Sequence, residues 1–391
     1  MACSLSFHHV DFRGPLSLEN HLGDSEARRV NFFFAKGRVA LYAILKAAGL
    51  GSADEVIIPG YTCVAVPQAV IHAGAKPVYA DVETDTYALD VPALANKITK
   101  RTKVIILQHT YGIPADVEQT LALAQEAGVM VVEDCCHSLG SQYKGKDLGR
   151  FGDAAFFSSQ WSKPVTTGLG GWAVINNRAL ARRMSRVYRN FAPPARIESA
   201  LLRAQVTAYR LAFKPKWFWA LRDAYRYLGY CGIVVPSSTR EELDGQRPGD
   251  YAKTMAGWQR QLLQKRLSHI GPAIAHRQRV AGEYEDLLRK LQRKTVTASV
   301  GAAPVFLRYP LQLSNKDLFL SEARRRRVEI GDWFVSPVHP LMDQWDRAGY
   351  QAGSCPRGEW LSNHVVNLPT HQGIGQEETR QIGSLIEQCA N

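Results

Sequence analysis

The chain has 391 residues, of which 46% are hydrophobic and 21% are charged, so its composition is that of a globular protein and excludes a disordered or fibrous one. This length fits two packed lobes better than one small core. No apolar run reaches the roughly 20 residues that span a bilayer. The first residues also lack a basic segment followed by an apolar stretch, so we expect no signal peptide and a cytoplasmic protein.

The cysteines and the net charge narrow the class of protein further. The seven cysteines are scattered, include the vicinal pair Cys135-Cys136 and show no metal-ligand spacing, so we expect reduced thiols and no metal site. The net charge is +12, with the excess concentrated in the second half of the chain. Because these basic residues form no recognisable nucleic-acid module, we interpret them as a solvated face and expect no nucleic-acid partner.

Short apolar runs alternate with helical patterns between about residues 30 and 190, which is typical of β/α units and a mainly parallel sheet. Several strands end on acids or hydroxyls, where open α/β sheets bind their ligands. The predicted helices cover 37–48, 62–73 and 116–127, and the predicted strands cover 55–59, 76–81, 104–107, 129–134, 154–158 and 171–175.

The character of the chain changes at about residue 195. The segment 195–250 is aromatic and basic, a long helical pattern runs from about 251 to 291, and the remainder mixes helices with strands at 305–311 and 365–368. We therefore predict a large α/β domain over 1–194, an insertion over 195–250, and linking helices with a small α+β domain over 251–391.

Lys163 is the first residue that suggests chemistry. It follows a buried strand and precedes the run Thr166-Thr-Gly-Leu-Gly-Gly171. A desolvated lysine has a lowered pKa and attacks an aldehyde as a free amine, as Schiff-base chemistry requires. Alone this signal is weak, because a lysine after a strand is usually a surface residue.

Two further features point to pyridoxal phosphate (PLP). Asp134 ends the strand Val131-Val-Glu-Asp134, and a buried carboxylate there would keep the ring nitrogen of PLP protonated. Gly37 and Arg38 open a predicted helix whose free N–H groups suit a phosphate, and Ser158 offers a hydroxyl. Taken singly, these features also fit ordinary helix caps.

In combination and in this order, these stretches closely resemble the DegT/DnrJ/EryC1/StrS family of fold-type-I PLP-dependent aminotransferases. The resemblance runs from about Gly37 to the C-terminus and is interrupted between about 195 and 250. The stretches that carry it include Gly37-Arg-Val-Ala-Leu41, Asp54-Glu-Val-Ile-Ile-Pro-Gly-Tyr-Thr62, His109-Thr-Tyr-Gly-Ile-Pro-Ala-Asp116, Glu133-Asp-Cys-Cys-His137, Ser158 to Gly171 and Leu368-Pro-Thr-His371.

The resemblance implies roles for individual residues. Lys163 looks like the lysine that forms the Schiff base and carries the proton, and Asp134 looks like the partner of the pyridinium nitrogen. His137 falls where the family places a Gln or His beside the cofactor ring, and Ser158 with the backbone of Gly37 and Arg38 looks like the phosphate site. The retained lysine favours a transaminase, because relatives that dehydrate sugars have a histidine there.

Three departures bear on the pocket. Cys63 stands where many relatives carry an aromatic residue that stacks on the cofactor, and Arg38, in place of a usual threonine, could add charge to the phosphate site. The stretch Trp333-Phe334 through His339 replaces the sugar-site His-Tyr-Pro stretch of the family and makes the pocket more apolar. Trp333, Phe334 and His339 are the candidate substrate contacts.

We therefore expect a homodimeric fold-type-I enzyme with shared active sites. It would move an amino group from an amino acid, by resemblance L-glutamate, to a carbonyl acceptor, foremost a nucleotide-linked keto-sugar. Alternatives on the same fold are a non-sugar or amphiphilic carbonyl substrate, and a dehydratase or aromatising synthase. A catalytically silent regulator is disfavoured by intact Lys163, Asp134 and Ser158, and a dinucleotide-binding oxidoreductase by the absence of a G-x-G-x-x-G spacing.

The aromatic-basic segment 195–240 leaves two interpretations open. Amphipathic basic segments with tryptophans lie in membrane interfaces, so one hypothesis is contact with a membrane surface or an amphiphilic substrate. The other, which we favour, is helix packing over the active site or the dimer interface.

Overall fold

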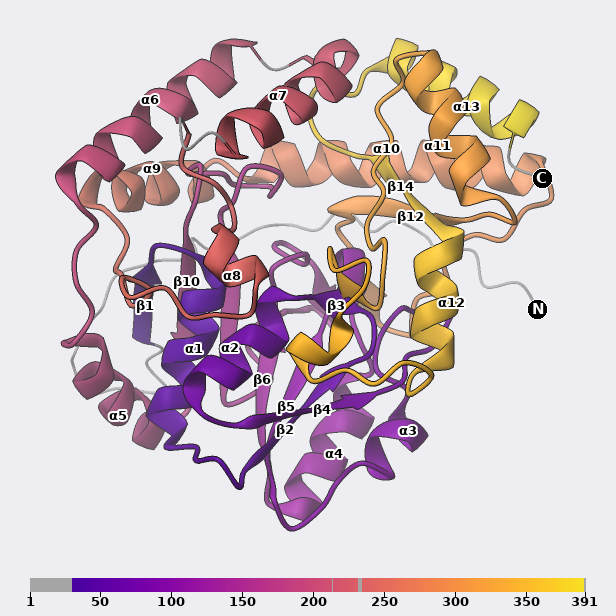
Figure 1. The fold of residues 1–391 in the computed structure, drawn as a ribbon. Coiled ribbons are helices and arrows are strands. Elements are labelled where there is room, and N and C mark those ends of the chain that lie inside the picture. Colours follow the sequence, from indigo (N-terminus) through magenta and orange to yellow (C-terminus); the bar gives the residue numbers. More distant parts are fainter. Residues whose placement is uncertain (1–29, 213, 231–233, 390–391) are drawn as a thin grey trace.

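The computed structural model describes residues 30–212, 214–230 and 234–389, and Figure 1 shows their arrangement. The expectation of no signal peptide concerns residues that lie outside this part. A seven-stranded sheet forms the centre, with the order β1-β10-β9-β6-β5-β2-β4. Its strands are β1 (Val30–Phe34), β2 (Glu55–Pro59), β4 (Lys76–Ala80), β5 (Thr102–Gln108), β6 (Met130–Asp134), β9 (Ala154–Ser158) and β10 (Gly171–Ile175).

The sheet is mostly parallel, as predicted. The pairings from β4 through β2, β5 and β6 to β9 are parallel, whereas β10 runs antiparallel to both β9 and β1. Strands β2 and β10 are buried along their whole length, which explains why they read as continuous apolar runs rather than alternating ones. The parallel strands therefore end together at one edge of the sheet.

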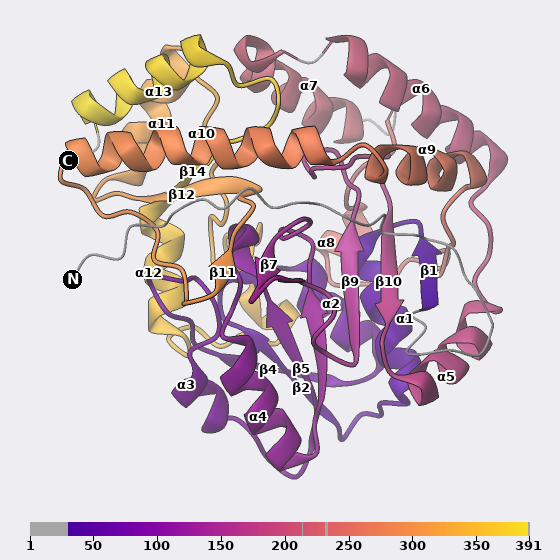
Figure 2. The ribbon, with the colours of Figure 1, turned by 180° about the vertical axis from the view of Figure 1, so that it is seen from behind.

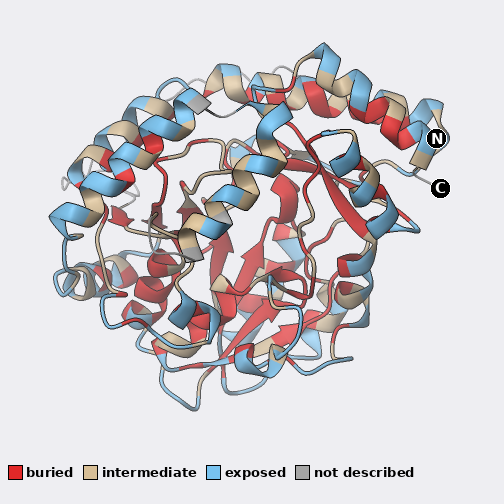
Figure 3. Cartoon of the chain, turned by 45° about the horizontal axis from the view of Figure 1, so that its top comes forward, coloured by how far each residue is buried: buried red, intermediate tan, exposed pale blue. Residues whose placement is uncertain are grey.

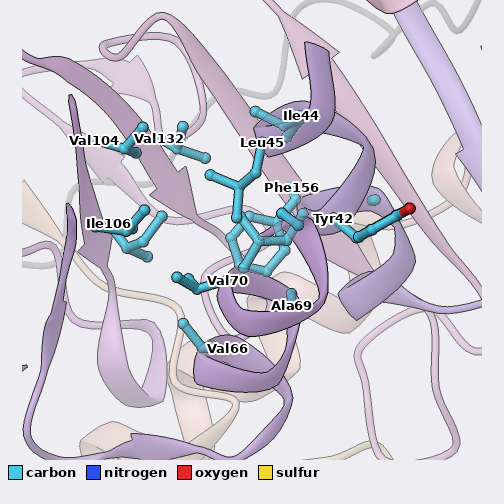
Figure 4. Close-up of a cluster of buried hydrophobic side chains, with 14 of the residues drawn as sticks. Tyr42, Ile44, Leu45, Val66, Ala69, Val70, Val104, Ile106, Val132 and Phe156 are labelled. Carbon is cyan, nitrogen blue, oxygen red and sulfur yellow. The ribbon is translucent and has the colours of Figure 1, made fainter. Parts of the chain in front are cut away.

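Helices cover both faces of this sheet. Apolar side chains of α1 (Gly37–Ala48), α2 (Ala65–Ala73) and α5 (Arg178–Tyr188) pack on one face. Figure 4 shows the heart of this layer, where Leu45 and Val70 meet Val132 and Phe156 of the strands. Helices α3 (Val91–Ala95), α4 (Val117–Ala127) and α9 (Gly257–Leu267) close the other face, which Figure 2 shows from behind.

The C-terminal part forms a smaller lobe with its own core. The antiparallel pair β12 (Arg308–Gln312) and β14 (Val365–Pro369) packs against helical residues such as Tyr284, Phe319 and Leu385. The helices here are α10 (Gly271–Lys290), α11 (Lys316–Arg325), α12 (Pro356–His364) and α13 (Gln376–Cys389). The remaining short strands are β3 (Thr62–Cys63), β7 (Gln142–Tyr143), β8 (Lys146–Asp147), β11 (Ala302–Ala303) and β13 (Val338–His339).

Two predicted helices differ in detail from the structure. The segment predicted as one helix over 62–73 begins with the short strand β3, because Thr62 and Cys63 pair with β13 of the smaller lobe, and only then becomes α2. The long helical pattern over 251–291 is two helices, since α10 restarts at Gly271 with a proline in its first turn.

Among its described residues, the predicted insertion contains three α-helices, of which the first two lie along the top of the molecule in Figure 1 and the third lies lower. It contains α6 (Arg196–Ala212), a short 3-10 turn at Pro215–Trp217, α7 (Phe218–Tyr230) and α8 (Arg240–Leu243). Within the described residues, every helix falls short of the length and apolar character that crossing a bilayer demands. The domain boundaries at 194 and 250 stay predictions.

Candidate active site at the sheet edge

Asp134 lies at the carboxyl end of β6, beside the end of β5, and is 6% exposed. Its Oδ1 accepts the backbone N–H of Cys136 at 2.9 Å. Burial raises the pKa of the Asp134 carboxyl, and the hydrogen bond from Cys136 and the charge of Lys163 act in the opposite direction. A cationic N–H group placed against this carboxylate would keep it ionised.

Lys163 lies on the loop between β9 and β10. This loop is closed by backbone bonds from Ser159 N–H to Gly170 O at 2.9 Å and from Thr167 N–H to Ser159 O at 2.8 Å. The Lys163 Nζ stands 5.5 Å from the centre of the Trp333 ring. Burial lowers the pKa of Lys163, whereas the neighbouring Cys136 and Asp134 raise it. The lowered pKa increases the fraction of the uncharged amine, the nucleophilic form of lysine.

His137 belongs to a stack of rings beside this lysine. Its ring lies nearly parallel to those of Trp333 at 5.8 Å and Phe334 at 6.0 Å, and Tyr111 stacks at 6.2 Å. The Nδ1 atom of His137 accepts the backbone N–H of Tyr111 at 3.3 Å. Burial and then the charges of Lys163 and His339 hold the pKa of His137 well below its usual range, so the imidazole is neutral.

The smaller lobe contributes the other wall of the site. His339 of β13 lies opposite Cys63 of β3 in a parallel pair, and its ring is 5.4 Å from that of Phe334. The Phe334 N–H donates to the Tyr61 hydroxyl at 3.3 Å. The structure therefore brings the candidate substrate residues, from the far end of the sequence, against Lys163 and His137.

The predicted phosphate site also assembles, with one difference. A side chain on Gly37 would meet Ser158 Cβ and Phe157 O at 3.2 Å, so the start of α1 lies directly against the end of β9. Lys36, which precedes α1, makes no side-chain cap, and the first N–H groups of a helix have no partner within it. The backbone at Gly37 and Arg38 and the hydroxyl of Ser158 thus remain a suitable cradle for a phosphate.

The Arg38 side chain belongs to another contact. Its Nη2 donates to the Ser238 hydroxyl at 2.8 Å, and its Nη1 lies 3.4 Å from Oε1 of Glu242 on α8. Lys36 pairs with the same carboxylate at 2.8 Å. Since the Arg38 guanidinium is engaged with Ser238 and Glu242, the idea that it adds charge to a phosphate loses support, and the backbone remains the candidate contact.

Glu133, next to Asp134, anchors the loop that follows. Its two oxygens accept the N–H groups of Gly149, Phe151 and Gly152 at 2.7–2.8 Å, and His109 Nε2 lies 3.3 Å away. His109 Nδ1 in turn accepts the Ala115 N–H at 3.1 Å. These bonds give the buried group of His109, Glu133 and Cys135 a structural role that fixes the position of Asp134.

Three residues at the site were missed in the sequence. Tyr61 and Tyr111 share a 2.7 Å hydroxyl contact, and the Tyr111 hydroxyl donates to Trp333 O at 2.8 Å. Arg308 lies 5.3 Å from the Trp333 ring and pairs with Glu329 at 3.1 Å. A charged residue inside a run with strand character was the available signal for Arg308.

These residues fit PLP. Asp134 offers a buried carboxylate for a cationic ring nitrogen, Lys163 a half-buried amine of lowered pKa for an aldehyde, and the start of α1 with Ser158 a cradle for a phosphate. The five cysteines among the described residues are all free.

Comparison with known proteins gives one consistent answer. The model of the "DegT/DnrJ/EryC1/StrS aminotransferase family" matches residues 18–207 and 220–387. A UDP-N-acetyl-3-dehydro-alpha-D-glucosamine 3-aminotransferase from Acidithiobacillus ferrooxidans is 30% identical over 354 residues, which cover 90% of this chain and 82% of that one.

Solved structures agree on the fold. DesV of S. venezuelae superposes with a TM-score of 0.71 at 24% identity, over 92% of this chain and 85% of that one. The putative sugar aminotransferase Spr1654 from Streptococcus pneumoniae, in its PMP-form, gives 0.70 at 20% identity, over 91% and 86%. The predicted fold class is thereby confirmed. The chain belongs to the DegT/DnrJ/EryC1/StrS family and is a PLP-dependent aminotransferase.

Proposed function

We propose that this enzyme transfers the amino group of L-glutamate to the carbonyl of a nucleotide-linked keto-sugar, in the synthesis of a polysaccharide or natural product. The observation that carries the proposal is the meeting of Lys163, Asp134 and His137 at one sheet edge, beneath rings of the smaller lobe. The Acidithiobacillus relative, whose name specifies a UDP-linked sugar, supports the acceptor class.

Bound PLP supplies a carbonyl carbon for amines and an electron-accepting ring for the pair released when a substrate C–H bond breaks. Lys163 would have two tasks: its Nζ would hold the cofactor at the aldehyde carbon, and as a free amine it would move a proton to and from the substrate carbon. Asp134 holds a proton at the ring nitrogen through its buried carboxylate. The start of α1 and Ser158 bind the phosphate, and neutral His137 orients the ring.

Trp333, Phe334 and His339 shape the acceptor side of the site. The Trp333 ring lies 5.5 Å from the Lys163 Nζ, and its face offers a stacking surface to a sugar or a base. The same apolar wall favours the second candidate, an amphiphilic or non-sugar carbonyl acceptor. Transamination rates with a nucleotide-linked keto-sugar and with an amphiphilic carbonyl compound, measured at equal concentration, would distinguish these candidates.

The family resemblance supports a homodimer with active sites shared between the chains. Light scattering of the purified protein tests the dimer. We also infer that the 195–240 segment contacts a membrane surface, and the outer face of α6 supports this inference.

The central test is the absorbance spectrum of the purified protein before and after addition of L-glutamate, with L-glutamine in parallel. We expect a yellow protein that bleaches with the donor and regains its colour with a keto-sugar nucleotide. A protein that takes up no PLP, or one that keeps its colour with every amino acid, would refute the proposal.

A further inference from the structure

The outer side of α6 presents an apolar row to solvent. Its members are spaced four, three, four and three residues apart, which places them along one line of the helix. Ile197 is 75% exposed, Leu201 48% and Leu211 79%. Ala204 and Ala208, also exposed, fill the positions between them. Figure 3 shows the exposed outer side of this helix along the upper left rim.

A row of arginines runs beside the apolar row. Arg196, Arg203 and Arg210 lie seven residues apart, each one position before a member of the apolar row, and all three are exposed. The acid of α6, Glu198, pairs with Lys253 at 2.6 Å, a lysine that also pairs with Asp250, and the three arginines outnumber it on the helix. The face is therefore both apolar and cationic.

The turn after α6 continues this character. Lys214 and Lys216 are exposed there, and Trp217 is 49% exposed with the Lys216 ammonium 5.7 Å from its ring. Tryptophan and lysine side chains are suited to the boundary between lipid headgroups and acyl chains, where one part of the residue is apolar and the other wet.

The opposite side of α6 fixes the orientation of this face. Leu202 and Val206 are 6% and 4% exposed and pack toward Gly168, on the loop between β9 and β10 that carries Lys163. Ser199 accepts a hydrogen bond from the Trp258 indole at 2.8 Å. Because these contacts use the inner side of the helix, α6 cannot rotate to bury its apolar row within the same chain.

We propose that the outer face of α6 docks the enzyme on an anionic lipid membrane. An apolar row flanked by arginines is the pattern of a helix that lies in the plane of a membrane interface. The cations match anionic headgroups, while the aliphatic side chains enter the acyl boundary. A helix of 17 residues is about 25 Å long, so both rows can touch one flat surface together.

Two other occupants fit less well. A two-fold contact between copies of this chain would bring the same row of arginines against itself, and like charges oppose that approach. A nucleic acid would use the cations and leave the exposed Ile197, Leu201 and Leu211 in water. The docking face depends on α6 alone and does not rest on the proposed reaction.

The experiment is flotation of the full-length enzyme with vesicles of phosphatidylcholine alone or with about a third phosphatidylserine. We expect the protein to float with the anionic vesicles and remain behind with the neutral ones. Replacing Arg196, Arg203 and Arg210 by Gln should weaken partitioning roughly 100-fold, since each basic residue near such a surface contributes about fivefold. Replacing Ile197, Leu201 and Leu211 by Ser should also abolish flotation.

Helix α5 supplies the matched control, because it carries exposed arginines without an exposed apolar row. Changing Arg182, Arg183 and Arg186 to Gln removes the same charge and should leave flotation unchanged. Equal loss in the α5 variant, or no loss in either α6 variant, overturns the proposal. So does a serine variant that falls from dimer to monomer in light scattering, because the face would then be a subunit contact.

Two readouts separate docking from folding and catalysis. All the replaced side chains are exposed, so melting temperatures and transamination of a dissolved acceptor should match the parent enzyme. On anionic vesicles the emission of Trp217, obtained as the difference from a Trp217→Phe variant, should shift to shorter wavelength. An unshifted spectrum contradicts insertion of the face into the lipid boundary.

Discussion

The Nζ atom of Lys163, on the larger lobe, lies 5.5 Å from the centre of the Trp333 ring, which belongs to the smaller lobe. The lysine side chain is half-buried beside that ring and the stack behind it. The same burial lowers the pKa of the lysine and prepares it to attack an aldehyde. Docking of the two lobes therefore creates the chemistry as well as the pocket.

Replacing Lys163 by Ala should remove both the bound yellow cofactor and the transfer of amino groups. Loss of a residue that holds a reacting group and moves its proton lowers turnover by about 10²- to 10⁴-fold or more. Visible absorbance of the purified protein measures the bound cofactor, and a coupled assay measures the transfer of amino groups. Lys103→Ala, at an exposed position on β5, serves as the control and should keep both properties. A coloured Lys163→Ala protein would mean that another amine binds the cofactor.

Asp134→Asn should shift the pH profile of PLP capture to lower pH. Burial lowers the pKa of Lys163 and the negative charge of Asp134 raises it, so removing that charge lowers it further. Only the uncharged amine attacks, so the capture rate rises with pH and levels off above the pKa of the lysine. Stopped-flow absorbance from pH 6 to 10 measures the midpoint. A midpoint pH that is unchanged or higher in the variant would contradict the charge interaction between Asp134 and Lys163. Transamination should fall in either case.

Gly37→Ala should weaken PLP binding. The new methyl group would meet Phe157 O and Ser158 Cβ at 3.2 Å, so the start of α1 must move away from β9. Overpacking of this size costs about 1–3 kcal/mol, which corresponds to roughly 5- to 150-fold in affinity. Gly271→Ala, at the start of α10 with no atom within 4 Å of the added carbon, should bind PLP as the parent does. Titration of the cofactor-free proteins measures both constants.

Trp333→Ala should affect the acceptor more than the donor. A stacked aromatic contact is worth about 0.5–1.5 kcal/mol, so we expect the acceptor KM to rise about 2- to 10-fold. The donor half-reaction, followed by bleaching with glutamate, should change less, because Lys163 and Asp134 remain in place. Equal losses in the two half-reactions would mean that the ring acts on the lysine and not on the acceptor.

The sequence predicted those parts of the molecule that depend on local pattern. The apolar positions of α1 repeat on one face, and the predicted bounds 37–48 are those of the helix. The restart of the helix at Gly271 was also readable, since Pro272 marks a helix start, yet the long apolar pattern concealed it. Strand β3 was missed because its partner β13 lies far along the chain.

The site divides in the same way. Lys163 and Asp134 could be found because each ends or follows a strand in a recognisable order. The direction of the Arg38 side chain could not, because it depends on Glu242 of the insertion. The ring over Lys163 could not either, because Trp333 reaches it only through packing of the smaller lobe. Contacts between distant segments carry no local signal.

Glu329→Gln should destabilise the smaller lobe in a pH-dependent way. The Glu329 side chain is 1% exposed and pairs with Arg308 at 3.1 Å and His371 at 2.9 Å. Burial alone would raise the pKa of this carboxyl, but the charges of His371 and Arg308 outweigh it and hold the pKa below 4.5. Leaving a buried cation without its partner costs about 3–5 kcal/mol at pH 7.

The sign of the pH effect follows from that direction. A carboxyl whose pKa is depressed by folding stabilises the protein fully above its ordinary pKa, and this contribution fades as the folded form takes up a proton. The difference between parent and Glu329→Gln in urea unfolding should therefore be complete at pH 7 and shrink below pH 4.5. Glu283→Gln removes an exposed ion pair with Arg279 on α10 and should change the free energy of unfolding little at either pH. A difference that persists undiminished in acid would show that the carboxylate charge is not what Arg308 requires.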